Sequence, residues 1–192
     1  MWNEQEIENY LIQNLKPKRY EHSLSVRDTS IKLAKLYNED IEKAKIAGLV
    51  HDCAKNMSDE KILDIAVNYN LQIDEIFKES PQLLHGAVAA VIAKEKMGIE
   101  DEDILNAVAY HTTGRKNMSQ LEKIIYLADY VEPLRDFPGV EELRKISYEN
   151  LDKALLMSFN NTIKFVLEKG QLIHLNTIEG RNFIILQLKI NK

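Results

Sequence analysis

The spacing of apolar residues constrains the fold of this chain more than any other feature. Apolar side chains recur every three or four positions along most of the 192 residues, whereas the strict apolar/polar alternation of half-buried β-strands is almost absent. No linker rich in Gly, Ser or Pro divides the sequence, and no repeat of about 20 to 50 residues is visible. These patterns predict an all-α protein with a single domain over residues 1–192.

Local start and stop signals position the helices. Ser58 precedes two acids and is a good N-cap, and Ser80 places a cap directly before Pro81. Pro133, Pro138 and Gly139 mark a loop. The predicted helices cover 3–15, 18–37, 40–52, 58–69, 81–97, 101–111, 119–131, 140–168 with a break, and 177–188.

Charge and composition exclude several classes of protein. Twenty-five basic against thirty acidic residues give a net charge of -5, which disfavours a surface that coats nucleic acid. No apolar run approaches the roughly 18 residues of a membrane span, and the opening residues are acidic where a signal peptide would be basic. The lone Cys53 has no partner for an internal disulfide. We therefore expect a cytoplasmic protein without nucleic-acid or membrane partners.

Four of the five histidines fall on or beside the apolar stripes of the predicted helices, where they would face the core. The stripes are His22–Val26–Thr29–Leu33–Leu36, Ile41–Ala44–Gly48–His51, and Ile104–Ala107/Val108–His111, with His85 beside Leu84–Val88–Val91. Taken singly, a buried histidine is more often hydrogen-bonded to a carbonyl or a carboxylate than bound to a metal. The placement of four together is more informative than any one of them.

Two acids join these histidines. Asp52 directly follows His51, and Asp129 interrupts the apolar run IIYLADYV. A carboxylate inside an apolar helix is destabilising unless it is neutralised, paired or coordinated, and no Lys or Arg lies within a turn of Asp129 on its own helix. A divalent metal that draws imidazole and carboxylate ligands from separate helices accounts for the whole set.

The sequence segments around these residues are similar to those of a known family. The segments are KRYEHSLSV at His22, GLVHDCAK at His51, SPQLLHG at His85, AVAYHTTGR at His111, and IYLADYVEP at Asp129. Together they resemble the all-helical HD-domain metal-dependent phosphohydrolases, and among them the YqeK-type bacterial symmetrical diadenosine tetraphosphate hydrolases. The likeness runs from about Lys18 to Arg135, and the tail LIHLNTIEGRN shares it.

This resemblance implies a ligand set and a metal. His22, His51, Asp52 and Asp129 would hold one ion, while His85 and His111 would complete a second site or position solvent and phosphate, with Asp52 able to bridge. The family metal is usually iron, with manganese or cobalt as substitutes. The donor types agree, because imidazole and carboxylate without thiolate suit these ions better than a structural zinc site.

The resemblance also implies residues that contact the substrate. Lys55 would clamp phosphate, although a cation there equally complements a helix C-terminus. The turn HTTGRK offers two hydroxyls and two cations, which are otherwise solvated, and Arg135 suits bidentate phosphate binding or a salt bridge with Glu132 or Asp136. The C-terminal helices within 140–192 would complete the nucleoside pocket. The expected substrate contacts are Lys55, His85, His111, Thr112, Thr113, Arg115, Arg135, Ile173, His174, Leu175, Asn176 and Thr177.

The reaction that the resemblance implies is hydrolysis of diadenosine tetraphosphate into two ADP by a metal-bound hydroxide, with Asp52, Lys55, His85 and His111 as catalytic residues. Cys53 lacks an evident activating base and is expected to pack as a small apolar residue rather than act as a nucleophile. Alternatives are an HD-type nucleotidase, a cyclic-nucleotide phosphodiesterase, or a module that senses nucleotides without turnover. Exposed helical faces would permit a homodimer.

Overall fold

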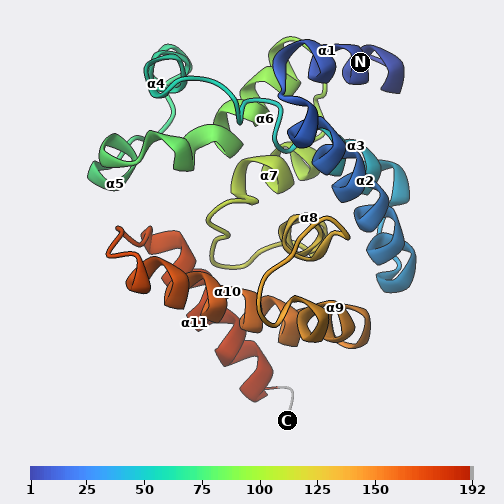
Figure 1. Cartoon of the computed structure of the whole chain (residues 1–192), viewed down its shortest axis with the longest axis vertical. Helices are drawn as coiled ribbons and strands as arrows, with labels where there is room; N and C mark the ends of the chain where they lie inside the picture. The colour runs from blue at the N-terminus through green and yellow to red at the C-terminus, as the bar shows by residue number, and fades with distance from the viewer. Residues whose placement is uncertain (191–192) are drawn as a thin grey trace.

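The computed structural model describes residues 1–190, and within them every regular element is helical (Figure 1). The elements are α1 (Glu4–Asn14), α2 (Pro17–Tyr37), α3 (Ile41–Val50), α4 (Asp59–Asn68), α5 (Glu75–Glu79), the 3₁₀-helix η1 (Pro81–Leu84), α6 (His85–Glu95), α7 (Glu102–Tyr110), α8 (Gln120–Val131), α9 (Val140–Glu149), α10 (Leu151–Glu168) and α11 (Leu175–Ile190). The predicted all-α fold class is confirmed. Asn191 and Lys192, which the predicted domain includes, lie outside the described residues.

Helix α8 lies at the centre of the fold. It contacts α2, α3 and α7 on one side and α9 and α10 on the other, as Figure 1 shows near the middle of the view. Ile124, Ile125 and Leu127 are fully buried, and α8 buries side chains around most of its circumference. Burial of apolar area at this position stabilises the fold by about 25 cal/mol for each Å² removed from water.

Side-chain caps fix where several helices begin. Asp40, Ser58 and Ser119 each accept hydrogen bonds from backbone N–H groups in the first turn of α3, α4 and α8. The predicted break within 140–168 is present at Asn150, which ends α9 in extended backbone and caps α10 by accepting from Lys153 N. The predicted cap at Ser58 is confirmed, whereas the side chain of Ser80, the predicted cap before Pro81, makes no capping hydrogen bond.

The chain departs from the predicted helices between 69 and 85. The five-residue helix α5 was not predicted, because it is too short to show periodicity, although Asp74 caps it. The predicted helix 81–97 begins as η1, and α6 begins only at His85. The carbonyl of Gln82 accepts from the backbone N–H of His85, an i to i+3 bond that tightens this turn.

Two residues of the predicted stripes do not face the core. Leu36 is 46% exposed because the buried stripe of α2 passes from Leu33 to Tyr37, whose hydroxyl donates to Ser147 O. Ile41 is exposed at the first position of α3, before its buried face begins at Ala44.

The chain from 1 to 190 contains no helix with both the length and the hydropathy that a membrane crossing requires.

Candidate metal centre and active site

Helix ends bring the predicted metal ligands to one buried point. His51 and Asp52 follow α3 directly, His85 is the first residue of α6, and His111 follows α7. The remaining two come from the helix interiors of α2 and α8: His22 and Asp129. All four imidazoles and Asp52 are buried, with exposed fractions of 6% or less.

Three of the imidazoles are held by their own helices. Nδ1 donates from His51 to Gly48 O at 2.7 Å, from His85 to Gln82 O at 2.5 Å, and from His111 to Val108 O at 2.7 Å. A carbonyl can only accept, so the hydrogen resides on Nδ1 and each Nε2 keeps a free lone pair. This is the tautomer in which an imidazole binds a metal through Nε2.

The fourth imidazole is oriented by a carboxylate. His22 Nδ1 lies 2.9 Å from Oε1 of the buried Glu132, whose Oε2 accepts from Ser25 Oγ and from Leu134 N, each at 2.6 Å. A carboxylate behind a metal-ligating imidazole fixes its orientation and raises its basicity. Glu132 is therefore the outer partner of His22.

The free imidazole nitrogens face the two carboxylates. His22 Nε2 lies 2.9 Å from Asp129 Oδ1, and His85 Nε2 lies 2.9 Å from Asp52 Oδ1. Asp52 turns Oδ2 toward His51 at 3.4 Å and Oδ1 toward His85 and His111, so its two oxygens serve both halves of the cluster. This is the arrangement expected of a bridging carboxylate.

The unsatisfied atoms fit a divalent metal. His22 Nε2, His51 Nε2 and Asp52 Oδ1 are buried without a hydrogen bond in the described chain, although ligand-type atoms surround them. Two groups have donor atoms that all lie within 4.8 Å of one another: His22, His51 and Asp129, and His51, Asp52 and His111. Buried polar atoms left unpaired are destabilising, and a cation coordinated by nitrogen and oxygen removes that penalty.

Burial and charge set the ionisation of the cluster. Burial lowers the pKa of His51 and His85, which keeps both rings neutral and able to bind metal. Burial acts to raise the pKa of Asp52 and Asp129, but the neighbouring imidazoles, and Arg135 beside Asp129, outweigh it and hold both pKa values well below their ordinary range. The carboxylates are therefore anionic and available as ligands.

Gly86 allows His85 and His111 to approach each other. A Cβ at this position would lie 2.8 Å from Ala109 O and 3.1 Å from His111 Nδ1. The absence of a side chain lets α6 approach α7 closely, and His85 Nε2 then lies 3.1 Å from His111 Nε2. The glycine of SPQLLHG thus has a packing role beside the site.

Two arginines contact the acids. Arg19 Nη1 lies 2.8 Å from Asp52 Oδ2, and Arg135 donates from Nε to Asp129 O at 2.8 Å and from Nη2 to Asp129 Oδ1. The cation that Asp129 lacks on its own helix therefore comes from the loop six residues later. The alternative to phosphate binding was a salt bridge of Arg135 with Glu132 or Asp136, but Arg135 lies 3.9 Å from Glu132 and makes its short contact with Asp129.

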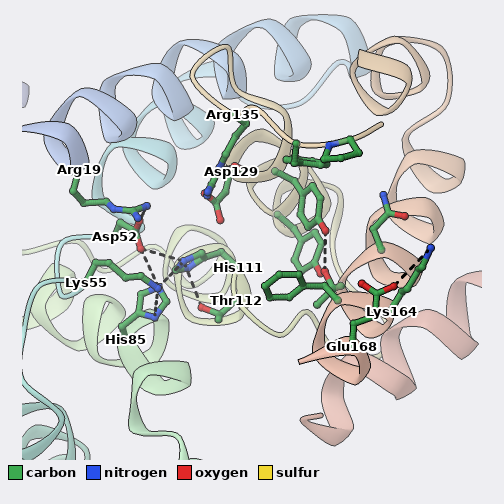
Figure 2. Close-up of a pocket in the computed structure, with 17 residues that line it drawn as sticks. Arg19, Asp52, Lys55, His85, His111, Thr112, Asp129, Arg135, Lys164 and Glu168 are labelled. Carbon is green, nitrogen blue, oxygen red and sulfur yellow. Dashed lines mark hydrogen bonds and ion pairs between the residues drawn. The ribbon is translucent and has the colours of Figure 1, made fainter. Parts of the chain in front are cut away.

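A cavity of about 770 Å³, which we call the aromatic cavity, opens from the cluster (Figure 2). Asp52, His85, His111 and Asp129 lie at one end with Lys55 beside them, and Lys164 and Glu168 lie at the far side. Its walls include the aromatic side chains of Tyr126, Tyr130, Phe137 and Phe165. Lys55 Nζ lies 3.4 Å from His85 Nδ1, and burial lowers the pKa of Lys55.

Some expected substrate contacts lie elsewhere. Thr112 lines the aromatic cavity, whereas Arg115 donates to the buried Glu122 and covers the ring of Tyr110 at 4.1 Å. The segment 173–177 contacts the HTTGRK turn, because Thr177 Oγ1 donates to Thr113 O. His174, Leu175 and Asn176 line a separate cavity of about 580 Å³. Their role with substrate stays a prediction.

Other site residues were missed by sequence reasoning. Arg19 precedes His22 by less than one turn, and Glu132 follows Asp129 by the same interval, so helical spacing could have indicated both. Cys53, in contrast, matches its expected inert role: it is 1% exposed, Sγ faces Ala89 O at 3.7 Å, and burial raises the pKa of its thiol.

Replacing Glu132 by Gln should weaken metal binding by roughly 10 to 100-fold. One amide cannot accept from His22 and also from both Ser25 and the N–H of Leu134, because its NH₂ group would face one of these donors. Titration of the metal-free protein with the ion measures the effect. Glu122→Gln is the matched control, since Glu122 is equally buried but pairs with Arg115. Equal affinities in the two variants would contradict the role of Glu132.

Comparison with known proteins agrees with this geometry. The HD domain model matches residues 19–134. A Halalkalibacterium halodurans protein named bis(5'-nucleosyl)-tetraphosphatase, symmetrical, is 44% identical over 171 residues, which cover 89% of this chain and 91% of that protein. A Bacillus subtilis protein of the same name is 39% identical, over 90% and 92% of the two chains.

A solved structure is similar over nearly the whole chain. The Clostridium acetobutylicum protein, described as a predicted HD superfamily hydrolase involved in NAD metabolism, superposes with a TM-score of 0.96 at 57% identity. The match covers 97% of this chain and 99% of that one. With the paired His51-Asp52, the two outlying ligands His22 and Asp129, and the helical frame that joins them, this chain belongs to the HD domain family.

Proposed function

We propose that this protein hydrolyses diadenosine tetraphosphate symmetrically to two ADP. The observation that carries the proposal is the aromatic cavity, which joins a buried His/Asp cluster to a wall suited to a nucleobase. The relatives named symmetrical bis(5'-nucleosyl)-tetraphosphatases match about nine-tenths of the chain, which supports the same substrate class. A polyphosphate at the cluster and an adenosine against the aromatic side chains would use both ends of the cavity.

We infer that the centre takes iron, with manganese or cobalt as substitutes. His22, His51, Asp52 and Asp129 would hold one ion, and His85 and His111 would complete a second position beside Asp52. A divalent ion bound there supplies positive charge for phosphate oxygens and acidifies water at neutral pH. The neutral rings of His51 and His85 and the ionised carboxylates of Asp52 and Asp129 are the protonation states that such binding requires.

The surrounding side chains would orient the polyphosphate. Lys55, Arg19 and Arg135 place three cations around the cluster, and Thr112 adds a hydroxyl at the cavity wall. Arginine matches phosphate in bidentate geometry, whereas lysine acts as a point charge. Tyr126 and the other aromatic side chains of the wall would exclude water from the nucleoside and stack on its base. Positioning of this kind supplies much of the rate enhancement in phosphoryl transfer.

We further infer a cytoplasmic homodimer. Several exposed apolar side chains belong to α10, to α11 and to the turn between them: Phe165, Leu167, Leu172, Leu175, Leu186 and Ile190. Large apolar surfaces of this kind commonly mark protein interfaces. Light scattering on the purified protein would measure the mass of the assembly directly, and a monomer at micromolar concentration would contradict the inference.

The metal-loaded protein should convert diadenosine tetraphosphate to ADP as its only nucleotide product. Chromatography of the products is the test, and reaction in oxygen-18 water should label one ADP of each pair. Formation of AMP and ATP would show asymmetric cleavage. Rapid hydrolysis of deoxynucleoside monophosphates or cyclic nucleotides, with the dinucleotide intact, would favour the nucleotidase or the phosphodiesterase. Tight binding without turnover of any of them would favour a sensor.

A further inference from the structure

A second cavity, of about 460 Å³, borders the metal cluster at His22. Arg19 and Arg135 line both this cavity and the aromatic cavity, so these two side chains border both spaces. His22 and Glu132 form part of its inner wall, and Lys16, Lys18 and Asn56 contribute to the rest. We call it the basic cavity. Its lining is rich in cations, whereas the aromatic cavity is lined by aromatic side chains as well.

The cations of the basic cavity stand at an unfavourable end of a helix. Lys16 is the N-cap residue of α2 and makes no capping hydrogen bond, while Lys18 and Arg19 lie in the first turn, which contains no acid. The N-terminus of a helix carries partial positive charge, so anions stabilise it and cations destabilise it. Helices α3, α4, α7, α8 and α9 follow the usual preference and have acids in their first turns. Lysines at this position therefore do not stabilise the end of the helix.

Little negative charge offsets them. Glu132 accepts hydrogen bonds from Ser25 and Leu134 N and lies against His22, and Glu21 is exposed. Within residues 1–190, Lys16 and Lys18 form no ion pair. Arg19 and Arg135 are paired with Asp52 and Asp129, so the charge left for a ligand is that of Lys16, Lys18 and the helix end. This combination favours an anionic ligand with several phosphate oxygens.

Resting on the proposed function, we propose that the basic cavity binds the departing ADP half of the dinucleotide through its phosphates. A substrate with a nucleoside at each end needs space on both sides of the bond that breaks, and the aromatic cavity accommodates one end. The water oxygen bonds to the attacked phosphorus, and the bridging oxygen leaves with the electron pair of the broken bond. The protons of the water pass to phosphate oxygens or to solvent. Lys16 and Lys18 then stabilise the charge that develops on the departing ADP.

The double variant Lys16→Ala/Lys18→Ala tests this subsite. Its kcat/KM for diadenosine tetraphosphate should fall by about tenfold or more, as expected for the loss of two charge-assisted phosphate contacts. Metal content should be unchanged. Calorimetry should find two ADP sites per chain in the metal-loaded wild type and one in the variant. Because the lysines oppose the helix dipole, the Tm should stay the same or rise.

Lys32→Ala/Lys35→Ala is the matched control, since it removes the same charge from exposed positions farther along α2. It should keep both ADP sites and the wild-type kcat/KM. An unchanged kcat/KM in the Lys16/Lys18 variant would overturn the proposal. An equal fall in both double variants would also overturn it, because it would indicate long-range attraction by net charge rather than a subsite. A marked drop in Tm of the Lys16/Lys18 variant would show a structural role instead.

This experiment separates the inference from the proposed function. If the wild type leaves the dinucleotide intact under all metals, the proposed activity fails, and the ADP titration still reports on the basic cavity. If the wild type produces ADP but the metal-loaded protein binds ADP at one site, the activity stands and the second subsite is wrong.

Discussion

Asp52→Ala is expected to remove bound metal and hydrolytic activity together. Both oxygens of Asp52 face the cluster, one toward His51 and the other toward His85 and His111, so this single side chain serves every part of the centre. Its loss also leaves the guanidinium of Arg19 without its buried partner. Metal affinity should fall by more than the roughly 10 to 100-fold that loss of an outer partner costs.

Elemental analysis of the purified variant, together with turnover measured in excess metal, tests this expectation. Asp52→Asn preserves shape and removes only the charge, and it should fail in the same way if charge is what the ion requires. Asp64→Ala, on the exposed face of α4, controls for the loss of a carboxylate and should behave as the wild type. Full metal content and ordinary turnover in Asp52→Ala would show that the proposed centre is wrong.

His111→Ala should lower kcat by on the order of a hundredfold or more, whereas Cys53→Ala should change it only a few-fold. His111 Nε2 points at His85 Nε2 and at Asp52 within the aromatic cavity, where the reacting phosphate would lie. Cys53 follows Asp52 in sequence but is turned into the core, and burial raises the pKa of its thiol.

Steady-state kinetics of the two variants, each with its metal content measured, separates two mechanisms. The pair tests two positions of similar burial, so a general effect of core mutation would appear in both. A large loss in Cys53→Ala with little in His111→Ala would instead indicate a thiol nucleophile, and the metal-based account would have to be abandoned.

The spacing of residues along the sequence predicts which helix faces are buried and where some helices begin. Periodicity places a residue on a helix face, which is why His22, His51 and His111 could be assigned to the interior from their spacing alone. Ser58 was predicted as a cap for the same reason and does cap α4, whereas the side chain of Ser80 makes no capping hydrogen bond. Where a stripe drifts near a helix end, as at Leu36, or where a helix has only five residues, as α5 does, the local signal fails.

Contacts between residues far apart in the sequence could not be predicted from local spacing. Glu132 meets His22 over 110 residues, and the aromatic cavity combines Tyr126 with Phe165 from a different helix. Arg115 shows a subtler limit: its sequence context suited either phosphate or solvent, whereas the packing of the buried Glu122 beside it provides a salt bridge. Choices of this kind depend on which neighbours the tertiary structure supplies.

The hydrogen bonds from His51, His85 and His111 to carbonyls three residues earlier have a further consequence. A ring anchored within its own turn of helix loses its rotational freedom when the chain folds, so little entropy remains to be lost when an ion arrives. The orientation of each imidazole also does not depend on the conformation of surface loops elsewhere. Cavity walls can therefore be remodelled by mutation while the coordinating rings keep their orientation, which gives a physical route for one such centre to acquire different substrates.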